Sequence, residues 1–68
     1  MIEKVKQKVC ALKGQRIRFR YNGSRNQIEE FEGVIVDCYN YVFVIATYKE
    51  NRSFSYSDVF MGVLELNV

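Results

Sequence analysis

The chain is predicted to be mainly β, with one N-terminal helix followed by five strands that close into a small barrel. An apolar stripe at helical spacing occurs in the first 13 residues, strict alternation of polar and apolar residues follows it, and turn residues separate the later apolar runs. The 68 residues, 49% of them apolar and 15% aromatic, suffice for one domain, 1–68, with one hydrophobic core.

The helix is predicted over residues 2–13. Apolar residues recur there at spacings of three or four, which places them on one side of a helix: Ile2, Val5, Val9 and Leu12. Gly14 follows this stripe and suits the left-handed conformation that commonly ends a helix. Because an isolated helix of this length is marginally stable in water, we expect it to pack on the barrel, residues 15–68.

Residues 15–21 are predicted to form the first strand, because polar and apolar residues alternate there and successive side chains of a strand point to opposite faces. The side chains expected to face inward are Ile17, Phe19 and Tyr21. Those expected to face outward are Arg16, Arg18 and Arg20. Asn22 and Gly23 then begin a turn, since this pair adopts positive φ angles easily.

The later segments complete the predicted barrel. Residues 28–39 are typical of a long strand that bends at Gly33, where a side chain would crowd the bend. Residues 41–48 are apolar on both faces, as in a strand buried on both sides. The remaining elements are a strand over 53–56, a helical turn over 57–60 capped at its start by Ser57, and a strand over 63–68. This order is typical of SH3-like and Sm-like barrels.

Charge is distributed unevenly, although the net charge is only +2. Residues 1–25 hold eight of the ten basic residues and one of the eight acidic residues, so they carry +7 while the rest carries −5. Such a split suggests a basic surface for an acidic partner. The alternative is that strands from the two halves lie side by side and neutralise each other. The candidate partner-binding residues are Lys13, Arg16, Arg18, Arg20 and Arg25.

The residue types that catalysis and metal binding require are sparse. There is no His, which removes the commonest general base and metal ligand, and two cysteines alone cannot form a four-ligand zinc site. The acidic residues from Glu29 to Asp37 could serve acid–base chemistry or bind a hard cation. Alternation instead favours pairing of Glu30 and Glu32 with the arginines of the first strand. We therefore expect no enzymatic activity, no cofactor and no metal.

The sequence also indicates where the protein acts. It has no run of about 18 apolar residues and none of the features of a signal peptide at its N-terminus. We expect a cytoplasmic protein that does not cross a membrane. Cys10 and Cys38 are then expected to be reduced thiols.

Two blocks of residues resemble a known family. The first joins Asn22-Gly23-Ser24-Arg25 to Gly33-Val34-Ile35 and to the run from Tyr39 to Ile45, and the second extends from Phe54 to Phe60 and closes with Leu64-Glu65-Leu66. In these residues and their spacing, the chain resembles the Veg family, short proteins of low-GC Gram-positive bacteria, over about residues 14–68. It departs at Asn26 and Gln27, where the family commonly has a dense basic run, and at Asn40, where proline is common.

The resemblance implies a regulatory role rather than a chemical one. The family is linked to stimulation of biofilm formation through transcriptional control of matrix genes, by opposing a repressor, and no catalytic residues are attributed to it. We therefore expect a non-enzymatic protein whose partner is a transcriptional regulator, bound through the basic strand. Two alternatives remain open: direct, nonspecific nucleic-acid binding by the same face, which the first departure weakens, and self-assembly into a homodimer.

Overall fold

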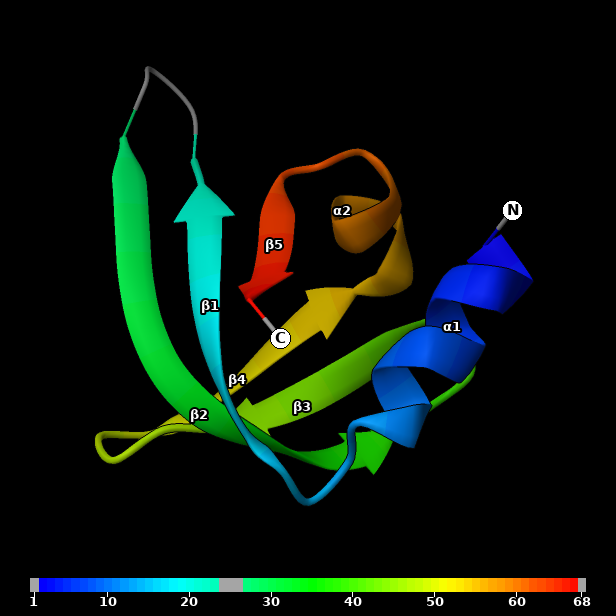
Figure 1. Cartoon of the computed structure of the whole chain (residues 1–68), viewed down its shortest axis with the longest axis horizontal. Coiled ribbons are helices and arrows are strands. Elements are labelled where there is room, and N and C mark those ends of the chain that lie inside the picture. Colours follow the sequence, from blue (N-terminus) through cyan, green and yellow to red (C-terminus); the bar gives the residue numbers. More distant parts are fainter. Residues whose placement is uncertain (1, 24–26, 68) are drawn as a thin grey trace.

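The computed structural model describes residues 2–23 and 27–67, which form one curved antiparallel sheet of five strands and two helices (Figure 1). The elements are α1 (Ile2–Ala11), β1 (Arg16–Asn22), β2 (Ile28–Cys38), β3 (Val42–Ala46), β4 (Asn51–Ser55), α2 (Tyr56–Phe60) and β5 (Leu64–Asn67). The prediction of a mainly β protein with an N-terminal helix and five strands is confirmed. No helix within the described ranges is long and apolar enough to cross a membrane.

The sheet is open, so the closure expected of a barrel is not found. Its strand order is β4-β3-β2-β1-β5, which leaves β4 and β5 at the two edges. The helix α2 joins these edge strands and contacts both of them. The curvature of the sheet brings its two edges toward each other (Figure 1). The edge strands do not pair, because both are short and α2 lies between them along the chain.

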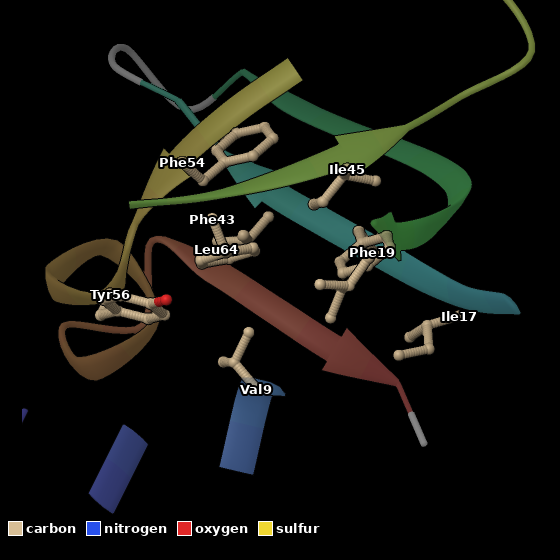
Figure 2. Packing of buried hydrophobic residues seen from close by; sticks show 9 residues of the cluster. Val9, Ile17, Phe19, Phe43, Ile45, Phe54, Tyr56 and Leu64 are labelled. Atoms are coloured by element: carbon tan, nitrogen blue, oxygen red, sulfur yellow. The ribbon is translucent and has the colours of Figure 1, made fainter. Parts of the chain in front are cut away.

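The hydrophobic core fills the concave face of the sheet. Its buried side chains come from every element (Figure 2): Val9, Ile17, Phe19, Ile35, Phe43, Ile45, Phe54, Tyr56 and Leu64. Along β1 the inward set is confirmed, because Ile17 and Phe19 are buried and Tyr21 packs against the core. Helix α1 contributes Val9 and packs on β2 and α2, as its apolar stripe predicted.

Two glycines act as the sequence predicted. At Gly33, an added Cβ would lie 2.5 Å from Cγ2 of Ile45 and 2.9 Å from the carbonyl oxygen of Ala46, so only glycine lets β3 approach β2 at the bend. Gly14 has a φ of +88°, and its N–H donates a hydrogen bond to the carbonyl oxygen of Ile35, 3.0 Å away. This bond ties the chain after α1 to β2.

Strand β3 differs from its prediction. Only one of its faces is buried, the one that carries Phe43 and Ile45, whereas Val42 is exposed and Val44 is half-buried. The prediction of burial on both sides was wrong because a single sheet has one covered face, and here the helices and the core residues cover only the concave one.

The start of α2 also differs from its prediction. The residue that caps the helix is Ser55, whose Oγ accepts a hydrogen bond of 3.3 Å from the backbone N–H of Asp58. Ser57, the predicted cap, is an exposed residue inside the helix. The helix begins earlier because Tyr56 belongs to its first turn and is buried in the core.

Candidate functional site

The outward side chains of β1 form the centre of the candidate site. Arg16, Arg18 and Arg20 are all exposed on the convex face of the sheet, as the alternation predicted. Strand pairing sets their neighbours: Arg20 lies opposite Glu30 of β2 and Glu65 of β5. In an antiparallel pair, residues directly opposite each other share one face and their side chains meet.

Carboxylates therefore accompany the arginines on this face. Arg18 lies opposite Glu32, and its Nε also stands 3.8 Å from Oε1 of Glu30. We name the combined set of three guanidinium groups and three carboxylates the outer charge ladder: Arg16, Arg18, Arg20, Glu30, Glu32 and Glu65. The charge split along the sequence is thus neutralised where strands from the two halves pair, which is the alternative that the sequence left open.

Arg16 forms one end of the ladder, and the remaining predicted site residues are Lys13 and Arg25. Arg16 stands across from Val34 rather than from a carboxylate. Lys13 is exposed in the turn after α1, so the end of β1 nearest that turn is its more basic end. Arg25 lies outside the residues that the structure describes.

A fifth arginine, Arg52, was missed by the sequence reasoning. Arg52 of β4 points to the concave side, where its guanidinium carbon lies 4.7 Å from the ring centroid of Phe31 and 5.2 Å from that of Phe54. Its Nη1 stands 3.2 Å from Oε1 of Glu29, and its side chain is 26% exposed. Such a half-buried cation over aromatic faces stabilises the packing of β2 against β4. The sequence signal that could have indicated this contact is the spacing of Arg52 and Phe54, which are two residues apart and therefore share one face of β4.

A polar groove adjoins the outer charge ladder. It runs between β2 and the turn that joins β3 to β4, and its lining includes Arg18, Glu30, Lys49, Glu50 and Tyr48. The ring of Tyr48 is 91% exposed, with Nζ of Lys49 5.7 Å from its centroid. The groove thus offers charges of both signs beside an exposed aromatic ring.

Further exposed apolar surface lies at the helical end of the molecule. Tyr39 and Tyr41 are both exposed at the turn from β2 to β3. An apolar groove between α1, α2 and β5 is lined by Val5, Leu12 and Phe60, among others. Within residues 2–23 and 27–67, no group of three or more His, Cys, Asp or Glu side chains could hold a metal ion.

These features define a small, mainly β protein with a single curved sheet whose exposed face carries opposed charges. Comparison with family models then identifies the chain. The model of the biofilm formation stimulator VEG matches residues 1–67, so the chain belongs to the Veg family. The match includes the N-terminal helix, whereas the sequence resemblance covers only about residues 14–68. Comparison with curated proteins gives no match.

Proposed function

We propose that this protein stimulates biofilm formation as a non-enzymatic regulator that binds another protein, a transcriptional repressor of matrix genes, in the cytoplasm. The family description supports the biological role. The repressor as partner is what the sequence resemblance implies. The observation that supports a protein partner is the outer charge ladder, in which a row of three exposed guanidinium groups on β1 lies beside three carboxylates of β2 and β5.

The balance of charge in the ladder favours a protein partner over a nucleic acid. Nonspecific binding to DNA or RNA depends on net positive charge, since each phosphate contact releases a counterion. Here each of Arg18 and Arg20 has a carboxylate directly opposite on β2, whose repulsion of phosphates offsets the attraction of the guanidinium group. A protein surface can complement both signs at once, and such complementarity fixes register and rejects wrong partners.

We extend the proposal to the fold. The N-terminal helix, the strand order and the strong curvature of the sheet support an SH3-like or Sm-like architecture with unpaired edges. In such an arrangement β1 is an interior strand, paired with β2 and β5, and its convex face is uncovered. The partner would then dock on a rigid surface rather than on a loop, which limits the entropy lost on binding.

A charge reversal on β1 tests the proposal. In cells that depend on this protein for biofilm formation, the variant R18E/R20E should lose most of the stimulated biofilm mass. The matched control is K4E/K8E, which changes the net charge equally at two exposed positions of α1, away from the ladder and its adjoining groove. Full stimulation by R18E/R20E, with both variants folded by circular dichroism, would remove this face as the docking surface.

Direct binding of oligonucleotides is a separate measurement. The purified protein should not retard mixed-sequence single- or double-stranded oligonucleotides in a gel at low salt. Binding that weakens steeply as salt is raised would contradict the protein-partner proposal and favour the nucleic-acid alternative.

A further inference from the structure

The two cysteines of the chain, with 27 residues between them in sequence, converge at one place in the fold. Cys10 lies in the last turn of α1, and Cys38 ends β2. Both are free and half-buried. The proposed function uses neither of them.

The hydroxyl of Tyr56 joins the two cysteine positions. It donates a hydrogen bond to the carbonyl oxygen of Tyr39, the residue after Cys38, at 2.8 Å. Sγ of Cys10 lies 3.8 Å from the same hydroxyl oxygen. One phenol oxygen therefore contacts both the end of α1 and the backbone next to the end of β2.

Other contacts hold α1 in this position. Val9, next to Cys10, is buried in the core, and the N–H of Gly14 donates to the carbonyl oxygen of Ile35 on β2. Figure 1 shows α1 crossing beside the end of β2. Contacts of Val9 before Cys10 and of Gly14 after it therefore hold the Cys10 thiol close to the end of β2.

We propose that Cys10 and Cys38 form a modification site at which a low-molecular-weight disulfide oxidises the two thiols to an intramolecular disulfide that links α1 to β2. One protein thiolate attacks the small disulfide and releases one small thiol. The second protein thiolate then attacks the resulting mixed disulfide and releases the other small thiol. The two protein thiols lose two electrons and two protons, and the small disulfide gains both as two thiols.

The environment of the pair sets the conditions for this exchange. Burial is the main cause that raises the pKa of Cys38 above 9.0, and the hydrogen bond with Cys10 and the charge of Cys10 raise this pKa further. A hydrogen bond with Tyr56 and the charge of Lys13 lower it by a smaller amount. The thiol of Cys38 is therefore protonated at neutral pH. Exchange requires a thiolate, so it is slow there and faster in mildly alkaline buffer.

The test uses oxidised glutathione with the full chain at about pH 8.5, where a thiolate fraction is available. The expected product is a monomer whose mass is lower by about 2 Da and whose thiols no longer react with iodoacetamide, because a disulfide has formed. Its thermal midpoint should rise by at least about 5 °C, since the disulfide restricts the unfolded chain, and dithiothreitol should reverse both changes. The variants C10S and C38S, which keep a polar atom of similar size, should each give a single glutathione adduct and no rise.

Three results would overturn the site. They are stable glutathione adducts on both cysteines of the wild-type chain, disulfide-linked dimers as the main product, or unmodified thiols after prolonged incubation at pH 8.5. C10A and C38A serve as second variants if either serine variant is unfolded. The outcome is independent of the proposed function, because it is measured on the isolated protein without a partner.

Discussion

Tyr56 is fully buried, yet its hydroxyl is satisfied by the hydrogen bond that it donates to the carbonyl oxygen of Tyr39. Among the residues that the structure describes, no buried side-chain oxygen or nitrogen lacks a partner. Burial, together with Cys10 and Cys38, raises the pKa of this phenol above its ordinary value of 10.0. The sequence predicted Tyr56 only as part of a short alternating strand, because its partners are remote along the chain.

Tyr56 should make the stability of the fold sensitive to alkaline pH. The unfolded chain releases the phenol proton near pH 10, whereas the native protein retains it to higher pH. The stabilisation is therefore complete below pH 10 and is lost as pH rises above it. Y56F should cost about 1 kcal/mol at pH 8, because the carbonyl of Tyr39 loses its donor, and should reduce the alkaline slope. Urea unfolding at pH 8, 10 and 11 measures both effects, and an unchanged slope in Y56F would contradict this assignment.

Gly33 gives a second prediction for a single residue. G33A places a methyl group against Cγ2 of Ile45 and the backbone oxygen of Ala46, at distances that require β2 or β3 to shift. We expect a loss of about 1–3 kcal/mol in unfolding free energy, as for other overpacked sites. G23A is the matched control, because a methyl group there meets its nearest neighbours at 3.4 Å. Equal stability of the two variants in urea unfolding would show that close approach at the bend does not require glycine.

At the scale of elements, the patterns of alternation and helical spacing were sufficient where one face of an element is buried. They predicted α1, β1 and the bent β2 close to their observed bounds. They failed in two places for physical reasons. The apolar residues of β3 indicated burial on both faces, although its convex face has no layer on it. The cap of α2 was placed at Ser57 because local sequence does not reveal that Tyr56 is drawn into the core.

The capping residue can be tested with two serines of the same segment. S55A should lower the free energy of unfolding by about 1 kcal/mol, because the N–H of Asp58 loses its acceptor. S57A, at an exposed position within α2, should change it by less than about 0.5 kcal/mol. Chemical denaturation of both variants provides the comparison. A larger loss for S57A than for S55A would restore the cap that the sequence predicted.

At the scale of the whole molecule, the sequence predicted the outward arginines of β1 but not the surface that they form. Glu30 and Glu32 were expected near these arginines from alternation alone. Glu65 was not, since β5 meets β1 only through the topology of the sheet. The excess of basic residues in the first 25 positions suggested a basic face. Strand pairing instead places carboxylates of β2 and β5 beside the arginines of β1, so this face carries charges of both signs. The contact of Arg52 with Phe31 likewise depends on the curvature of the sheet, because β4 and β2 are not neighbouring strands.

The proposed docking of a protein partner depends on the arrangement of charges on the convex face and not only on the stability of the fold. R18E/R20E places like charges directly opposite each other on β1 and β2, which should lower the free energy of unfolding by about 0.2–1 kcal/mol for each pair. R18E/R20E/E30R/E32R exchanges the signs of the positions paired between β1 and β2, so it should recover the stability lost there while presenting a different surface, with position 20 still opposite Glu65 of β5. Thermal unfolding measures the recovery for both variants.

The most direct measurement is the biofilm mass that these two variants support, compared with wild type, when all three are produced at equal levels. We predict that R18E/R20E/E30R/E32R unfolds near the wild-type temperature and still fails to stimulate biofilm formation, as R18E/R20E does. Recovery of stimulation together with recovery of stability would contradict the claim, because the face would then matter only for folding.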